Sequence, residues 1–294
     1  MKLALGTVQF GATYGISNTS GQTPLREVAA ILDSAKEAGI TLLDTAPLYG
    51  QSEEILGQLL GKNHSFNIVT KSPHFADTTS LDDAAEQLVT TFTQSLRRLK
   101  QENIYGFLIH RADNLIAPEG DRFYRELLRL KEKGMVDKIG VSVYNEEQIN
   151  QIIRRFPIDV IQAPINLFDQ RLLRSGSFAK LKTFGIEIHA RSVFLQGLLL
   201  MPPEKIHPYF TPIRSQLAAY RKTMQQQNAP LQAGALSFVK QIKAVDKIII
   251  GVNNRRQLLN NIAAYYHPLP QHVEFATFAC DDLSMILPGQ WRLN

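Results

Sequence analysis

The sequence is poor in cysteine, with only Cys280 among its 294 residues. One thiol cannot form a disulfide within the chain, and no group of cysteines and histidines has the spacing of a zinc site. We therefore expect neither a disulfide-stabilised fold nor a bound metal. Both absences favour a reducing compartment, so the expected location is the cytoplasm.

Long hydrophobic runs are also missing. No apolar segment approaches the roughly 20 residues that a membrane span needs, and Met1–Gly6 is too short for the core of a signal peptide. Membrane association is not expected. With 44% hydrophobic and 20% charged residues, the composition is typical of a globular protein with a large core.

An excess of one charge is present but small, at +5. Lysine and arginine are spread along the chain instead of gathering with aromatic residues, so nucleic acid is not an expected partner. The excess is compatible with an anionic ligand such as a dinucleotide. Taken alone, it is explained more simply by an ordinary basic surface.

Short apolar runs rich in β-branched residues alternate with longer stretches of helical period almost from end to end. The predicted strands are Leu3–Gly6, Thr41–Asp44, Asn67–Thr70, Tyr105–Ile109, Lys138–Ser142, Asp159–Ala163, Ile186–Arg191 and Lys247–Gly251. Right-handed crossovers place such strands in parallel, and eight strand–helix units can close into a barrel. The prediction is a single (β/α)8 TIM barrel domain over residues 1–294, with its active site at the carboxyl ends of the strands.

The helical stretches have clear boundaries. Predicted helices include Ser80–Lys100, Glu119–Lys133 ending before Gly134, and Leu25–Ala38 ending before Gly39. A doubly wound open sheet is the competing fold, but the Gly-x-Gly-x-x-Gly turn that normally follows its first strand is absent. The longest irregular stretch, Gln196–Pro212, follows the seventh strand, and loops of that length are often functional.

Four polar side chains stand at the carboxyl ends of consecutive predicted strands or in the loops after them. They are Asp44, Tyr49, Lys71 and His110. Each alone has a structural explanation, as a helix cap, a packing residue, a solvated charge or a buried imidazole. Their convergence on one barrel mouth favours catalysis instead.

Such a set suits the reduction of a carbonyl group. A tyrosine can donate a proton to a developing alkoxide, and a nearby ammonium lowers its pKa. The carboxylate keeps the ammonium charged and in place, and a neutral imidazole orients the substrate oxygen. Because no side chain donates hydride, this chemistry requires a nicotinamide cofactor.

The segment Leu43–Gly57 resembles the signature of the aldo-keto reductase family, and Asp44, Tyr49, Lys71 and His110 match its four catalytic residues. The resemblance continues through weaker fragments to Ile250–Asn253. It implies a cofactor extended across the barrel mouth. The residues matching its cofactor site are Thr7, Ser142, Gln162, Arg191, Ser192, Phe194, Gly197, Gly251, Asn253, Arg255, Gln257 and Asn261.

Three positions depart from the pattern. Arg191 replaces the aromatic residue that many members stack on the nicotinamide, and Val143 replaces a frequent asparagine. We hypothesise that Arg191 covers the nicotinamide edge or a pyrophosphate oxygen, held by His189 or Glu187. The alternative is an arginine that binds loop carbonyls. Gln257 stands where members often place an arginine for the 2′-phosphate.

The predicted function is therefore reduction of a small aldehyde or ketone, such as a sugar or an aromatic aldehyde. NADPH is the expected cofactor, with NADH as the alternative, because Arg255 and Arg256 can supply cations for the 2′-phosphate. A regulatory or sensing protein that binds the cofactor with little turnover is the competing function. Phe10, Tyr14 and the stretch 196–212 are expected in the pocket wall.

The chain's tail leaves a further question open. Residues 279–291 could fold over the mouth and bring Trp291 to the substrate, but a packed surface aromatic is the alternative role. The sequence does not indicate the oligomeric state.

Overall fold

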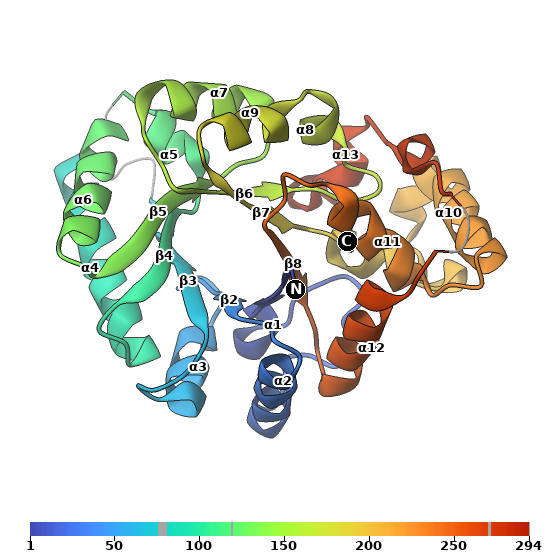
Figure 1. Cartoon of the computed structure of the whole chain (residues 1–294), viewed down its shortest axis with the longest axis horizontal. Coiled ribbons are helices and arrows are strands. Elements are labelled where there is room, and N and C mark those ends of the chain that lie inside the picture. Colours follow the sequence, from blue (N-terminus) through green and yellow to red (C-terminus); the bar gives the residue numbers. More distant parts are fainter. Residues whose placement is uncertain (76–80, 119, 270–271, 294) are drawn as a thin grey trace.

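Eight parallel strands close into a barrel in the computed structural model, which describes residues 1–75, 81–118, 120–269 and 272–293. Each strand pairs with its neighbours in the chain, and β8 returns to β1, as Figure 1 shows. The strands are β1 (Leu3–Gly6), β2 (Leu42–Asp44), β3 (Asn67–Lys71), β4 (Ile104–Ile109), β5 (Val136–Ser142), β6 (Val160–Pro164), β7 (Glu187–Arg191) and β8 (Lys247–Gly251). The predicted (β/α)8 fold is confirmed.

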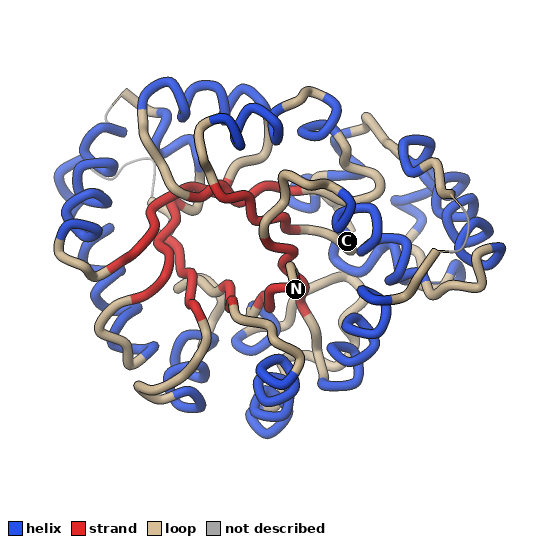
Figure 2. Tube along the Cα trace, in the orientation of Figure 1, coloured by secondary structure: helices blue, strands red, loops and turns tan. Residues whose placement is uncertain are grey.

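Helices form a ring around the strands (Figure 2). The α-helices are α1 (Val8–Gly11), α2 (Leu25–Glu37), α3 (Ser52–Leu60), α4 (Leu81–Leu99), α5 (Ala112–Ile116), α6 (Gly120–Glu132), α7 (Glu146–Arg155), α8 (Arg171–Arg174), α9 (Ser177–Thr183), α10 (Arg214–Gln226), α11 (Leu231–Gln241), α12 (Arg255–Tyr266) and α13 (Leu283–Ile286). The 3-10 helices are η1 (Leu195–Leu200), η2 (Pro203–Lys205), η3 (Pro208–Ile213), η4 (Phe275–Phe278) and η5 (Pro288–Gln290).

Strand alternation divides the core into two parts. One face of the strands packs against the helices, and the other fills the barrel with a small apolar cluster of Ala4, Leu42, Val69, Leu108, Val160 and Ile249. Successive strand residues point to opposite sides, so the residue two positions further along each strand also points inward, towards the mouth. Those next residues are Gly6, Asp44, Lys71, His110, Gln162 and Gly251. The apolar layer therefore forms the floor of the site.

The predicted element boundaries are mostly within one or two residues of those observed. β1 and β8 have the predicted ends, and the predicted helix Ser80–Lys100 corresponds to α4. Ser80 and Glu119 lie outside the described residues. The predicted irregular stretch Gln196–Pro212 contains no α-helix or strand, but it does contain short 3-10 turns, namely η1, η2 and most of η3, and Gln196 and Gly197 within η1 have non-helical backbone angles. These turns are hard to predict from the sequence, because the stretch contains several prolines and lacks a helical hydrophobic pattern.

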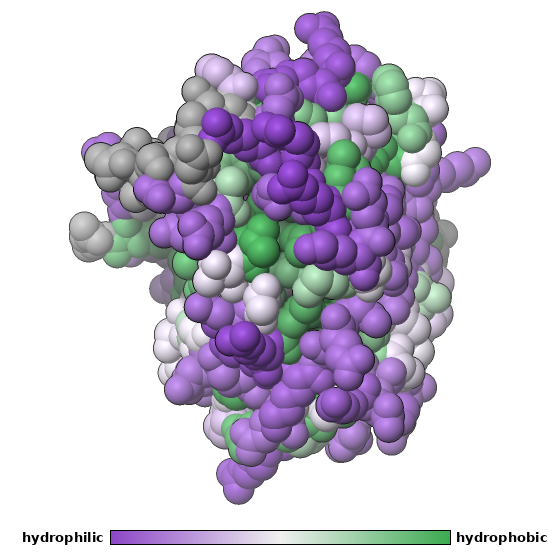
Figure 3. All heavy atoms as spheres, turned by 90° about the vertical axis from the view of Figure 1, so that its left-hand side faces the viewer, coloured by the Kyte–Doolittle hydropathy of each residue, from purple (hydrophilic) through white to green (hydrophobic). Residues whose placement is uncertain are grey.

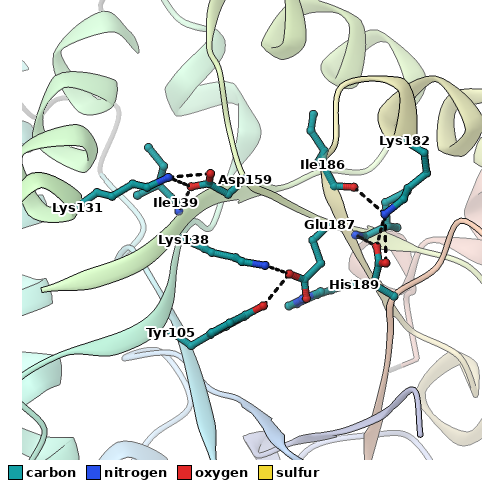
Figure 4. A network of polar contacts seen from close by, with 11 residues as sticks. Tyr105, Lys131, Lys138, Ile139, Asp159, Lys182, Ile186, Glu187 and His189 are labelled. Atoms are coloured by element: carbon teal, nitrogen blue, oxygen red, sulfur yellow. Dashed lines mark hydrogen bonds and ion pairs between the residues drawn. The ribbon is translucent and has the colours of Figure 1, made fainter. Parts of the chain in front are cut away.

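An ionic network occupies the amino-terminal end of the barrel (Figure 4). Glu187 begins β7, and its carboxylate accepts hydrogen bonds from the Tyr105 hydroxyl (2.7 Å) and the Lys138 ammonium. The buried His189 ring lies 2.9 Å from the other carboxylate oxygen. Burial alone would raise the pKa of Glu187, but hydrogen bonds from His189, Lys138 and Tyr105 outweigh it and hold the pKa below its ordinary value. The network links β4, β5 and β7 beneath the apolar floor.

We expect Glu187→Gln to lower the free energy of unfolding by about 2 kcal/mol at neutral pH, because it leaves Lys138 and His189 without their carboxylate. Since the pKa of Glu187 is lowered in the folded protein, its contribution is complete above the ordinary pKa and is lost as pH falls. Urea titrations at several pH values measure this. Glu102→Gln, in an exposed pair with Lys62, is the matched control and should change stability by less than about 0.5 kcal/mol. Equal effects of the two substitutions would contradict the prediction.

The outer surface is largely polar where Figure 3 shows it, on the side of α4 and α6. Hydrophilic side chains cover most of this face, and hydrophobic ones gather in a small central area. Across the described residues, none of the helices combines the length and apolar character needed to cross a bilayer.

Candidate active site

A cavity of about 730 Å³ opens at the carboxyl ends of the strands. It extends from the ends of β1, β2, β4, β5 and β6 across the loop after β7 to the beginning of α12. The cavity walls include three of the four predicted catalytic residues, Asp44, Tyr49 and His110. The fourth, Lys71, lies behind them and is buried.

The four predicted residues lie together around the Lys71 ammonium. Its Nζ donates to both carboxylate oxygens of Asp44, at 2.8 and 2.9 Å, and to the backbone carbonyl of Thr45 at 2.9 Å. It also donates to the Tyr49 hydroxyl at 3.3 Å. The Lys71 and Asp44 side chains are 1% and 5% exposed, so this is a desolvated ion pair. Lysine is thus fixed between a carboxylate and a phenol.

Two glycines allow the Tyr49 loop to lie against the loop after β1. A Cβ on Gly11 would lie 1.8 Å from the Tyr49 carbonyl oxygen, and one on Gly50 would lie 2.1 Å from the Gly11 carbonyl oxygen. Gly50 also has a φ of 56°, which favours glycine. The Ser52 hydroxyl lies 2.8 Å from Thr7 Oγ1 and joins the same two segments. The signature residues around Tyr49 therefore set its position.

Burial and the nearby positive charge shift the pKa of Tyr49 in opposite directions. Burial raises the pKa of Tyr49, the Lys71 ammonium lowers it, and the net result is a raised pKa. The ammonium acts to lower the pKa of Tyr49, as expected, but burial, which was not considered, outweighs it. Burial also acts to lower the pKa of Lys71, but Asp44 and Tyr49 outweigh it and the pKa is raised. At neutral pH the pair is a neutral phenol beside a charged ammonium.

His110 completes the group. Its ring lies edge-on to the Tyr49 ring, with centroids 6.2 Å apart, and 4.9 Å from the ring of His74. The backbone N–H of His110 donates to the Ser72 hydroxyl at 3.0 Å. Burial, followed by the charges of Lys71, His74 and Arg191, lowers the pKa of His110 to about 2. The imidazole is therefore neutral at physiological pH.

This pKa predicts a histidine that does not titrate. In proton–nitrogen NMR spectra, the ring signals of His110 should stay those of a neutral imidazole from about pH 8 to pH 5. The His110→Gln variant assigns those signals by their loss. A midpoint near 6.5, the ordinary value for histidine, would show that the site is more hydrated or less positive than the structure indicates.

Ser142 and Gln162, the residues predicted to hold the nicotinamide carboxamide, are neighbours in the register of β5 and β6 and both line the cavity. The Gln162 amide donates to Asp44 at 2.7 Å. Across the described residues, no hydrogen bond is made by the Gln162 carbonyl oxygen or by the Ser142 hydroxyl. One free acceptor and one free hydroxyl thus stand side by side.

The loop after β7 has an unusual backbone. Ser192, Leu195 and Gln196 have φ values of 61°, 48° and 52°, a region that non-glycine residues rarely adopt, and Gly197 follows at 92°. A Cβ on Gly197 would lie 2.0 Å from Ser17 Oγ in the loop after β1. The predicted residues Ser192, Phe194 and Gly197 all line the cavity. Strained backbone of this kind often occurs at ligand sites.

Four of the five residues predicted for the adenosine end line the cavity. Gly251, Asn253, Gln257 and Asn261 line the cavity, as does Asn260. Arg255 is not in the cavity wall, because its guanidinium Nε donates to the Ser34 hydroxyl of α2 at 2.7 Å. Thr7 does line the cavity, and its hydroxyl donates to the Asp44 carbonyl oxygen at 3.0 Å.

Arg191 lies in the cavity wall near Tyr49 and His110. Its guanidinium donates to the Val143 carbonyl at 3.1 Å and to the Ser192 hydroxyl at 3.3 Å. The expectation that His189 or Glu187 holds it is wrong, because the Glu187 carboxylate binds Tyr105, Lys138 and His189. The contact with a loop carbonyl, predicted as the alternative, is present.

Sequence reasoning placed some cavity residues wrongly and missed others. Phe10 is fully buried in the core and is not in the cavity wall, whereas Tyr14 is. Trp291 packs edge-on against Phe210 with centroids 4.9 Å apart, which is the structural alternative for the tail. Missed wall residues include Gln9, Ser17, Tyr144 and Gln232. The positions of Gln9, Ser17 and Tyr144 after strands were the available signal, whereas Gln232, in α11, had none.

Comparison with known proteins identifies the family. The model of the Aldo/keto reductase family matches residues 2–277. The chain belongs to the aldo/keto reductase family. It is 27% identical over 280 residues to the uncharacterized oxidoreductase YqkF of Bacillus subtilis, covering 90% of each chain. It is 32% identical over 188 residues to the aldo-keto reductase YhdN of the same species, covering 59% of this chain and 53% of that relative.

A solved structure supports the fold. The holo form of aldo-keto reductase AKR11C1 from Bacillus halodurans superposes with a TM-score of 0.73 at 22% identity, covering 94% of this chain and 90% of that one. The aldo/keto reductase family comprises oxidoreductases that act on carbonyl substrates with nicotinamide cofactors. The fold and the class of chemistry are therefore fixed, and the substrate and the role of each residue are the next questions.

Proposed function

We propose that this aldo/keto reductase uses NADPH to reduce a small aldehyde or ketone to an alcohol, with Tyr49 as the proton donor. The observation that carries the proposal is the Lys71 ammonium, which bonds Asp44 and the Tyr49 hydroxyl next to the cavity. A sugar or an aromatic aldehyde fits a cavity whose walls mix the aromatic Tyr14 and Tyr144 with polar groups such as Gln232.

The residues present fit a nicotinamide dinucleotide. The free Ser142 hydroxyl and Gln162 carbonyl oxygen can pair with a carboxamide, which both donates and accepts. The strained loop at Ser192–Gly197 lines the cavity and can direct backbone N–H groups to phosphates, and the beginning of α12 brings Asn253 and Gln257 to the same wall. We propose that Thr7, Ser142, Gln162, Arg191, Ser192, Phe194, Gly197, Gly251, Asn253, Gln257 and Asn261 hold the cofactor. Arg255, directed towards α2, keeps only an indirect role at the adenosine end.

The bound cofactor supplies the hydride. Tyr49 donates its hydroxyl proton to the carbonyl oxygen of the substrate as negative charge develops there. Lys71 stabilises the phenolate that remains, and Asp44 keeps the ammonium in place. His110, neutral because of its low pKa, donates a hydrogen bond to the same oxygen and sets the direction of the carbonyl.

A turnover assay tests the proposal. The protein is incubated with NADPH or NADH and a panel of 4-nitrobenzaldehyde and sugars, and consumption of reduced nicotinamide is followed by absorbance. Turnover with at least one aldehyde and preference for NADPH are expected. Cofactor binding without turnover of any member of the panel would instead support the regulatory function.

Two further expectations stay proposals. We propose that residues 1–294 form one domain, supported by a barrel whose last strand pairs with its first. We also propose that the protein works in the cytoplasm, where its one buried thiol, Cys280, needs no partner.

A further inference from the structure

Arg191 is a cation with unused hydrogen-bonding capacity. A guanidinium has five N–H donors, and the hydrogen bonds of Arg191 go to the Val143 carbonyl and the Ser192 hydroxyl. The guanidinium also lies 4.3 Å from the centroid of the Tyr144 ring. Within the described part of the chain, no carboxylate pairs with it. The geometry thus holds a positive charge in place without neutralising it.

The rest of the cavity does not neutralise this charge either. Its charged wall residues, among those the structure describes, are Asp44, Arg191 and Lys205. Asp44 is already paired with the buried Lys71, so that couple contributes no net charge. The wall therefore carries an uncompensated positive charge. Arg191 lines the same cavity as Tyr49 and His110, and its charge acts to lower the pKa of each, although the net pKa of Tyr49 stays raised.

Hydride transfer would change the charge of the nicotinamide ring of the cofactor. Two electrons and a proton leave the neutral dihydronicotinamide as hydride and form a C–H bond at the carbonyl carbon, while the Tyr49 proton goes to the oxygen. The remaining ring is a pyridinium with one positive charge. A substrate oxygen between Tyr49 and His110 requires the ring to lie in the same cavity as Arg191. A fixed cation there repels the oxidised ring and not the reduced one.

We propose that Arg191 makes the protein discriminate between the two redox states of its cofactor, binding the reduced form tightly and releasing the oxidised form. The inference rests on the proposed function. The positive charge of Arg191 also stabilises the negative charge that develops on the substrate oxygen. During the reaction this stabilisation offsets the repulsion between Arg191 and the oxidised ring. The consequence of weak binding of the oxidised cofactor is a reductase that this product inhibits only weakly.

Binding measurements separate this role from simple phosphate binding. NADPH and NADP⁺ carry the same phosphates and differ by the ring charge, so the ratio of their dissociation constants isolates the effect on the ring. Isothermal titration calorimetry should show the wild-type protein binding NADPH at least about tenfold more tightly than NADP⁺. In Arg191→Gln the ratio should fall by about tenfold, and Arg191→Lys should restore most of it.

Lys205→Gln is the matched control, because it removes the other cation of the described wall. It should leave the ratio of the two dissociation constants unchanged. A wild-type ratio near one, or an Arg191→Gln ratio equal to that of wild type, overturns the inference while the proposed function stands. A wild-type protein that binds neither form overturns both. The wild-type ratio decides the matter even if Arg191→Gln does not fold.

Discussion

Tyr49→Phe is expected to lower kcat by about a thousandfold while cofactor affinity changes by less than about twofold. The substitution removes one oxygen, which accepts a hydrogen bond from Lys71 at 3.3 Å and is the proposed proton donor. The phenyl ring keeps the packing against His110 and the cation–π contact with Lys71, 4.9 Å from the ring centroid. The loss should therefore appear in the chemical step and not in folding.

The measurement is steady-state turnover together with calorimetric binding of NADPH. Tyr266→Phe is the matched control, because Tyr266 is 61% exposed and is not part of the cavity wall. That variant should keep wild-type turnover. If Tyr49→Phe retains more than about a tenth of the wild-type kcat, another group or a water molecule donates the proton and the proposed mechanism is wrong.

Lys71→Met should have the largest effect on stability, lowering the free energy of unfolding by about 3–5 kcal/mol. It leaves the Asp44 carboxylate, 5% exposed, without its counter-ion. Because the pKa of Lys71 is raised in the folded protein, the stabilisation is complete below the ordinary lysine pKa and is lost only as pH rises through the folded value. Urea unfolding at neutral pH measures the difference, and activity should be lost as well.

The double variant Asp44→Asn, Lys71→Met separates the loss of stability from the loss of activity. Removing the orphaned charge should recover more than half of the lost stability, since an uncharged amide costs much less to bury than an unpaired carboxylate. Turnover should stay absent, because nothing then stabilises the Tyr49 phenolate. If the free energy of unfolding of the Lys71→Met single variant falls by less than about 1 kcal/mol, water reaches the Asp44 carboxylate and the prediction is wrong.

The fold could be predicted because parallel barrel strands are buried on both faces and appear as short apolar runs. The inward positions of β2, β3 and β4 follow from strand alternation, and they place Asp44, Lys71 and His110 at one mouth. The signature around Tyr49 added the fourth residue. The part of the site that depends on backbone topology was therefore available from the sequence.

The remaining part depends on which partner a flexible side chain finds, and no pattern in the sequence encodes that. Arg191 binds Val143 instead of Glu187, because Glu187 lies at the other end of β7, where its carboxylate binds Tyr105, Lys138 and His189. Arg255 lies near the beginning of α12 but turns to Ser34. The balance between burial and charge at Tyr49 likewise requires coordinates, since it depends on distances that residue types do not specify.

The contact between Gly11 and the Tyr49 loop has a practical consequence for engineering. The segment that begins at Gly11 also carries Tyr14 and Ser17, which form part of the cavity wall. Exchanging this segment with that of a relative to broaden substrate range would also replace the surface that the loop of Tyr49, the proposed proton donor, packs against. A graft that omits Gly11 would displace Tyr49 from Lys71. A change in substrate selectivity would then be accompanied by a loss of turnover.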